Sequence, residues 1–161
     1  MKKLVLILVV TVFSLLAHAQ MDTICGLIPI KDKKVCYEGV VVGNYSASTI
    51  YSNAKVWVAS NFGSAGAVIQ TDVVNTSLVL KGILKEDEYT TYNFTLTLQF
   101  KDGRYKYTLT DLYYHFMTVE NPVENMPFMS SCIEKTVIDF NTFFTGFIDR
   151  IEKGIKQDNN W

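Results

Sequence analysis

The chain has 161 residues, of which 48% are hydrophobic and 13% aromatic, and its formal net charge is −1. This content of apolar side chains can offset the entropy lost on folding, which excludes intrinsic disorder except at the chain ends. The small net charge argues against a nucleic-acid partner, because proteins bind a phosphate backbone with clustered lysine and arginine.

The first 19 residues have the three zones of a cleavable signal peptide. Lys2 and Lys3 form the charged zone, residues 4–16 are apolar, and Ala17-His18-Ala19 has the small-x-small form of a cleavage site. The apolar run of about 13 residues is shorter than the roughly 20 that a membrane-spanning helix needs. We therefore expect export to the periplasm, the cell envelope or the outside of the cell, with no membrane span after cleavage.

Residues 20–161 are enough for one domain and too few for two ordinary ones, so we expect a single domain with its core at about 31–156. Without Lys2 and Lys3, 13 basic residues face 16 acidic ones, a net charge of −3. Cys25, Cys36 and Cys132 allow one disulfide in an oxidising compartment, and the third cysteine then stays free or bridges to another chain. Their spacing matches no zinc pattern, so we expect neither a metal site nor a cofactor.

The first predicted elements are a strand and a helix. Residues 34–42 are dense in β-branched and aromatic types, which predicts a strand. The next segment is an amphipathic helix that Ser46 or Ser48 can cap and Gly63 ends, because apolar side chains recur at steps of three and four residues. These apolar residues are Ile50, Tyr51, Ala54, Trp57, Val58 and Phe62.

Two shorter apolar runs, residues 67–74 and 77–84, predict a hairpin around Asn75-Thr76. Gly82 lies inside the second run, and an isolated glycine in a strand indicates a bulge.

The strongest pattern is residues 89–116, where apolar and polar side chains alternate on both sides of Asp102-Gly103. An Asp-Gly pair between alternating runs predicts a hairpin with a two-residue turn. In that register one face is aromatic and aliphatic, and it includes Asp111. The opposite face is polar, as expected of a sheet surface in water. It carries Asn93, Thr95, Thr97, Gln99, Lys106, Thr108 and Thr110.

The last predicted element is a long helix. Ser131-Cys132-Ile133-Glu134 has the form of a capping box, and a stripe of apolar residues at helical spacing follows. The stripe consists of Ile133, Val137, Phe140, Phe144, Phe147, Ile148, Ile151 and Ile155. Two apolar helices and a one-faced antiparallel sheet of about five strands predict a two-layer α+β domain. The expected order is β-α-β-β-β-β-α, with both helices on one face.

Three segments, residues 35–41, 51–62 and 100–111, resemble a family of secreted bacterial proteins known as domain of unknown function 4468. The similarity spans roughly residues 31–114. The resemblance implies a fold like that of the TATA-box-binding protein, and it implies no activity and no catalytic residues.

Three functional hypotheses remain open. The first is a non-catalytic envelope protein that binds a protein or glycan partner across the polar face. The second is a small enzyme with a site near Asp111, Tyr113 and His115, since Asp111 and His115 share a strand face. The third is self-association through a strand edge or the unpaired cysteine. DNA binding on the sheet is not expected, because the polar face of the hairpin has few Arg or Lys and no apolar wedge.

Overall fold

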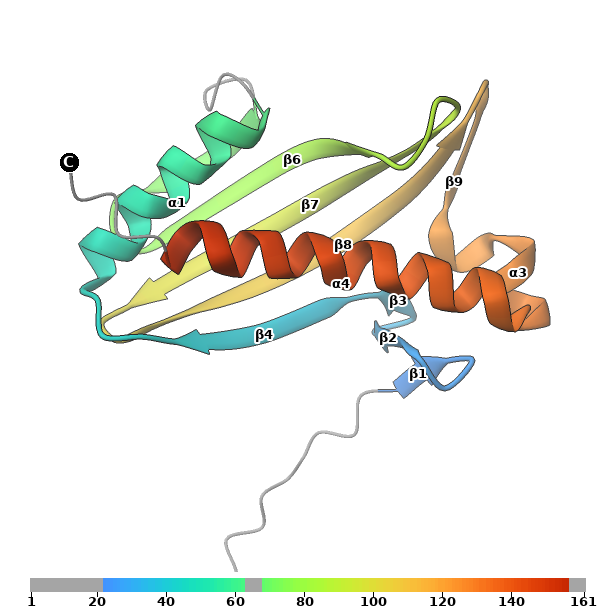
Figure 1. Cartoon of the computed structure of the whole chain (residues 1–161), viewed down its shortest axis with the longest axis horizontal. Coiled ribbons are helices and arrows are strands. Elements are labelled where there is room, and N and C mark those ends of the chain that lie inside the picture. The colour runs from blue at the N-terminus through green and yellow to red at the C-terminus, as the bar shows by residue number, and fades with distance from the viewer. Residues whose placement is uncertain (1–21, 63–67, 157–161) are drawn as a thin grey trace, which may run out of the picture.

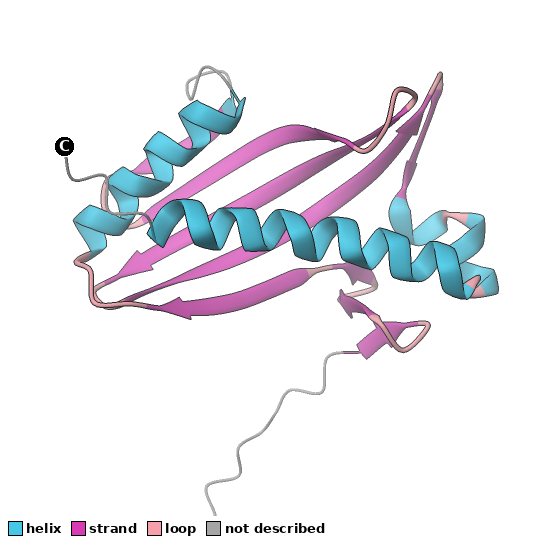
Figure 2. Cartoon of the chain, viewed as in Figure 1, coloured by secondary structure: helices cyan, strands magenta, loops and turns pink. Residues whose placement is uncertain are grey.

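The computed structural model describes residues 22–62 and 68–156. Its main sheet is antiparallel with the strand order β4-β8-β7-β6-β5, and β9 pairs with the end of β8 (Figure 1). The strands are β4 (Tyr37–Val42), β5 (Ile69–Val73), β6 (Ser77–Lys85), β7 (Thr90–Lys101), β8 (Arg104–Phe116) and β9 (Val119–Pro122). The helices α1 (Ala47–Phe62) and α4 (Glu134–Lys156) lie on the same face of this sheet (Figure 2). This confirms the predicted two-layer α+β fold.

The structure also contains short elements that the sequence patterns did not predict. They are β1 (Asp22–Ile24), β2 (Ile28–Lys31), a 3-10 helix η1 (Val123–Asn125) and α3 (Pro127–Ser131), together with β9, which adds a strand to the expected order. The short strand β3 (Lys34–Val35) is the first part of the strand expected at 34–42. The strand expected at 34–42 is divided at Cys36, whose N–H donates to the Pro29 carbonyl at 3.0 Å. Its first part, β3, therefore pairs with β2 in a second, three-stranded sheet, and only β4 joins the main sheet. The expected signal peptide and Gly63 lie outside the described residues.

The β7–β8 hairpin has the predicted register, with Phe100 opposite Tyr105 and Leu96 opposite Leu109. Its turn is attached to the beginning of α1. The Asp102 carboxylate accepts a hydrogen bond from the Ala47 N–H at 2.8 Å, where a helix N-terminus favours negative charge. The Ser46 hydroxyl accepts from the Thr49 N–H at 3.2 Å, so Ser46, not Ser48, caps the helix.

The expected bulge at Gly82 is wrong. The β6–β7 register runs through Gly82 and Phe94 without a shift. A Cβ at Gly82 would lie 2.6 Å from the Phe94 ring, so glycine at this position leaves room for that ring.

A bulge occurs in β8 instead, between the pairs Thr95–Thr110 and Asn93–Tyr113. Asp111 adopts a positive φ of 50° there, a conformation that Asp tolerates better than most residues. The extra residue reverses the alternation along β8, so Leu112 is buried. Asp111 turns to the polar face, where it lies beside Asn93 and Thr95. The prediction that Asp111 lies on the aromatic face is therefore wrong.

The core lies between the sheet and the two long helices. The predicted stripe on α4 is buried from Val137 to Ile155, and its aromatic residues meet those of β7. The ring centroids of Tyr92 and Phe144 are 5.1 Å apart, and those of Phe94 and Phe147 are 5.3 Å apart. Such contacts add to the free energy gained by burying the rings.

The beginning of α4 differs from the prediction. Ser131 does not form a capping box, because its hydroxyl donates to the Pro127 carbonyl inside α3 at 2.8 Å. Cys132 then has a φ of 47°, which separates α3 from α4. Ile133 precedes α4 and is 54% exposed, so it is not part of the buried stripe.

Cys25 and Cys132 form a disulfide with their Cα atoms 5.4 Å apart, and Cys36 is free and buried. The bond joins the β1–β2 turn to the segment before α4, across a sequence separation of 107 residues. It therefore connects the N-terminal small sheet to the C-terminal helix.

The double variant Cys25→Ser/Cys132→Ser removes the disulfide and is expected to lower the free energy of unfolding by about 2–4 kcal/mol. Without the covalent loop, the unfolded chain gains conformational entropy. Urea unfolding with and without reductant measures this. Reductant should bring the wild type to the level of the variant, whereas Cys36→Ala should stay sensitive to reductant. If reductant leaves the free energy of unfolding of the wild type unchanged, the Cys25–Cys132 pairing is contradicted.

Two glycines of α4 form a matched pair for testing the helix packing. A Cβ at Gly154 would overlap the indole of Trp57 on α1, whereas a Cβ at Gly146 would meet nothing within 4 Å. Gly154→Ala is therefore expected to lower the free energy of unfolding by about 1–3 kcal/mol through overpacking. Gly146→Ala should raise it by up to about 1 kcal/mol, because alanine favours the helix. Equal effects in a denaturant titration would show that α1 and α4 do not pack this closely.

Candidate functional site

The face of the main sheet that points away from α1 and α4 is called the open face below. All seven predicted binding residues lie on it. Thr97 is opposite Thr108, Gln99 is opposite Lys106, and Asn93 lies two positions before Thr95 on the same strand. The residues between them, such as Leu96 and Leu98, are buried in the core on the other side. The structure therefore brings the seven residues together, as the hairpin pattern predicted.

The centre of the open face offers side chains and no free backbone groups. β7 is paired with β6 along one edge and with β8 along the other, so its N–H and C=O groups are used in the sheet. Binding at this centre therefore depends on hydroxyl, amide and charged side chains.

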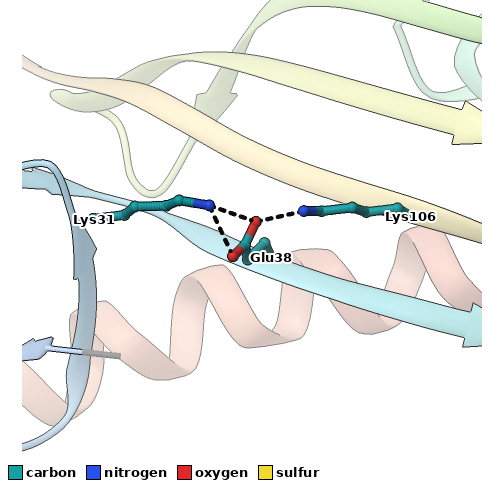
Figure 3. A network of polar contacts seen from close by, with 3 residues as sticks. All are labelled: Lys31, Glu38 and Lys106. Carbon is teal, nitrogen blue, oxygen red and sulfur yellow. Dashed lines mark hydrogen bonds and ion pairs between the residues drawn. The ribbon is translucent and has the colours of Figure 1, made fainter. Parts of the chain in front are cut away.

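Charged side chains cross the open face near β4. The Glu38 carboxylate accepts hydrogen bonds from Lys31 on β2 at 3.1 Å and forms an ion pair with Lys106 on β8 at 2.7 Å. Figure 3 shows the two lysines reaching Glu38 from opposite sides. The hydrogen bonds from Lys106 and then Lys31 lower the pKa of Glu38 below its ordinary value. This network connects the small sheet to the main sheet and holds the ammonium group of Lys106 on the open face.

A hollow of about 390 Å³ lies at the bulge in β8. The Asp111 carboxylate accepts a hydrogen bond from Lys34 at 2.8 Å, and this bond lowers the pKa of Asp111. Tyr113 is 38% exposed beside it. The lining residues are Gln70, Lys81, Gly82, Ile83, Asn93, Phe94, Thr95, Asp111 and Tyr113. We call this site the bulge hollow.

A second hollow of about 330 Å³ lies near the β7–β8 turn. It is lined by Val40, Thr76, Gln99, Phe100, Lys101, Arg104, Tyr105 and Lys106. Sequence reasoning did not single out Lys101 or Arg104, although the predicted register already placed them opposite each other. With Lys31, Lys34 and Lys81, they make the surroundings of the open face richer in cations than the hairpin pattern indicated. We call this site the cationic hollow.

Asp111 and His115, the two titratable residues of the enzyme hypothesis, have different neighbours. His115 is opposite Thr91 on β7 and Glu120 on β9, whereas the Asp111 carboxylate is bound to Lys34. Four positions along a strand correspond to roughly 13 Å, which is beyond hydrogen-bond reach. The structure therefore places the two side chains on one face without bringing them together as an acid–base pair.

The described residues contain no group of three or more His, Cys, Asp or Glu side chains that could hold a metal ion. No helix within residues 22–62 and 68–156 is long and apolar enough to cross a membrane.

The segment that carries the open face matches a known protein family. A family model described as "Domain of unknown function (DUF4468) with TBP-like fold" matches residues 37–115, the segment from β4 to the end of β8. This segment of the chain belongs to the family. The resemblance found in the sequence is thereby confirmed, and it includes β4, α1 and the hairpin that carries the open face. No curated protein matches the chain significantly.

Two solved structures share the fold of this DUF4468 protein. A DUF4468 family protein from Bacteroides ovatus superposes with a TM-score of 0.62 at 12% identity, covering 83% of this chain and 93% of that one. A TBP-like protein from Parabacteroides distasonis gives a TM-score of 0.55 at 17% identity, covering 81% of this chain and 99% of that one. At these identities the similarity establishes the fold alone.

The variant Glu38→Gln tests the lysine–glutamate network through its pH dependence. Because the folded-state pKa of Glu38 is lowered, its carboxylate stabilises the fold above its ordinary pKa of 4.5, and this contribution disappears as the pH falls through the folded value. We expect the variant to lose less than about 1 kcal/mol near neutral pH, because the network is partly exposed.

Urea unfolding at neutral pH and well below pH 4.5 measures the difference. The wild type and Glu38→Gln should converge at the lower pH, and Glu88→Gln, in an exposed loop, should match the wild type near neutral pH. If the two proteins still differ in their free energy of unfolding at low pH, the effect of Glu38 comes from packing and not from charge.

Proposed function

We propose that this DUF4468 protein is an exported, non-catalytic binding protein that holds a protein or glycan partner across its open face. The observation that carries the proposal is the placement of seven polar side chains on two paired strands of a sheet that helices cover only on the other side. Together they provide hydroxyl, amide and ammonium groups on one continuous surface.

The accessibility of these side chains supports the proposal. Thr95, Thr97, Thr108 and Thr110 are half-buried among their cross-strand neighbours, which limits their rotamers before a partner arrives. A partner that binds side chains already held in place loses less conformational entropy. The two hollows also make the open face concave at two places.

Export is supported by the sequence of residues 1–19 and is consistent with the Cys25–Cys132 bond, since disulfides persist in oxidising compartments. Cell fractionation of the native host, with mass spectrometry of the N-terminus, tests export and cleavage after Ala19 independently of binding.

The double variant Thr97→Arg/Thr108→Arg tests the binding surface. The two residues are directly opposite each other at the centre of the open face, so two arginines would block contact with a partner while leaving the core unchanged. We expect immobilised variant protein to lose at least about 10-fold in affinity for the envelope component that the wild type retains.

The control is Thr142→Arg, the same substitution on an exposed position of α4, and it should bind like the wild type. Thermal unfolding of all three proteins checks that they fold. Retention of the same component by the open-face variant would contradict the proposal.

A further inference from the structure

The cationic hollow contains an unfavourable arrangement of charges. Lys101 and Arg104 are directly opposite each other on either side of the β7–β8 turn, and Lys106 lines the same hollow. Like charges at directly opposite positions of an antiparallel pair destabilise the hairpin. Such local conflicts occur in proteins mainly where a functional requirement maintains them.

Among the ion pairs formed by the described residues, none involves Lys101 or Arg104. The acid next to them in sequence, Asp102, accepts a hydrogen bond from the Ala47 N–H at the start of α1. Glu38 is shared between Lys31 and Lys106. Three cations line the hollow, whereas the acids beside them are Asp102 and a Glu38 that Lys31 shares. The hollow therefore keeps an excess of positive charge in a chain whose formal net charge is −1.

We propose that the cationic hollow binds the carboxylate groups of an acidic glycan, whose neutral sugar hydroxyls lie along the open face toward the bulge hollow. This inference rests on the proposed function and names its ligand class. Arg104 can hold a carboxylate with two parallel N–H donors, and Lys101 adds a mobile point charge. Gln99 and Thr76 line the same hollow and supply neutral donors and acceptors.

The dimensions of the face suit an extended chain. Gln99 borders the cationic hollow and Asn93 borders the bulge hollow. Their separation of six positions along β7 corresponds to roughly 20 Å. Thr95 and Thr97 lie between the two, with Thr110 and Thr108 opposite them. A linear ligand with many hydroxyl groups can therefore contact both hollows and the threonines between them.

A glycan fits this surface better than the other polyanions do. An acidic peptide in extended form binds through main-chain hydrogen bonds at a sheet edge, and β7 has no free edge. Single-stranded nucleic acid stacks its bases on several exposed aromatic rings. Of the aromatic residues that line the two hollows, Phe94, Phe100 and Tyr105 are buried and Tyr113 is exposed. Sugar hydroxyls match threonine, asparagine and glutamine side chains directly.

The test uses the purified, isotope-labelled protein and three probes: a short oligogalacturonate, its methyl ester, and an oligoglutamate of equal charge. We expect the oligogalacturonate to shift the amide signals of residues 93–106, with an affinity that falls as salt is added. The methyl ester, which has the same sugar chain without charge, should bind about 10-fold more weakly or worse.

Two charge-reversal variants form a matched pair. Lys101→Glu/Arg104→Glu should lose at least about 10-fold in affinity for oligogalacturonate. Lys135→Glu/Lys153→Glu changes the net charge equally on α4 and should bind like the wild type. Lys101→Thr should weaken binding while raising the thermal midpoint of unfolding, because it removes the like-charge pair. A lower midpoint would show a structural role and overturn the inference.

The outcomes separate the inference from the proposed function. Equal binding of the methyl ester would overturn the anionic ligand while leaving a glycan-binding face, and equal binding of oligoglutamate would overturn the choice of a glycan. No shift on the open face with any probe would also overturn the inference. The proposed function fails separately, when Thr97→Arg/Thr108→Arg retains the envelope component as well as the wild type does.

Discussion

The aromatic side chains of β7 pack directly on those of α4, with Tyr92 against Phe144 and Phe94 against Phe147. These rings are nearly inaccessible to water, and their burial supplies much of the driving force that holds the long helix on the sheet. Gly82 on β6 and Gly154 on α4 have no side chain because aromatic rings occupy the space beside them. The position of α4 and the spacing of the two layers therefore depend on this contact.

Because both long helices pack on one face of the main sheet, the other face presents polar side chains. Strands that alternate apolar and polar residues can bury only one set of side chains. The apolar side chains of the strands pack against the helices, and the polar side chains form the open face. The same alternation that builds the core thus presents the threonines, Asn93 and Gln99 on a surface whose backbone groups are already paired. Recognition on this surface depends on side chains whose positions the sheet determines.

The two ends of the open face differ because different constraints act on them. At one end Asp102 holds the β7–β8 turn to the first residue of α1, and Gly103 holds it to the loop before that helix. Lys101 and Arg104 lie opposite each other there, and neither forms an ion pair with another described residue. At the other end the bulge turns Asp111 to the open face, where Lys34 neutralises it. One hollow therefore keeps an excess of positive charge, and the other holds the Lys34–Asp111 ion pair. This difference in charge between the two ends favours one orientation of an extended ligand on the face.

The sequence by itself determined the features that depend on local periodicity and turn chemistry. The alternation around Asp102-Gly103 predicted the hairpin, its register and the seven residues of the polar face. The apolar stripe predicted α4, and the family segments predicted the fold. Each of these follows from residues close together in the chain, where the spacing of side chains already defines which face they share.

Tertiary structure decided what depends on residues far apart in sequence. The bulge moved Asp111 to the open face, because Leu112 fills the core position that simple alternation had given to Asp111 and Lys34 meets its carboxylate. Cys25 paired with Cys132 and not with Cys36, because the β1–β2 turn lies beside the start of α4. Gly82 stayed in register, because the Phe94 ring needs its space. None of these contacts has a local signature, since each depends on where another element lies in the folded chain.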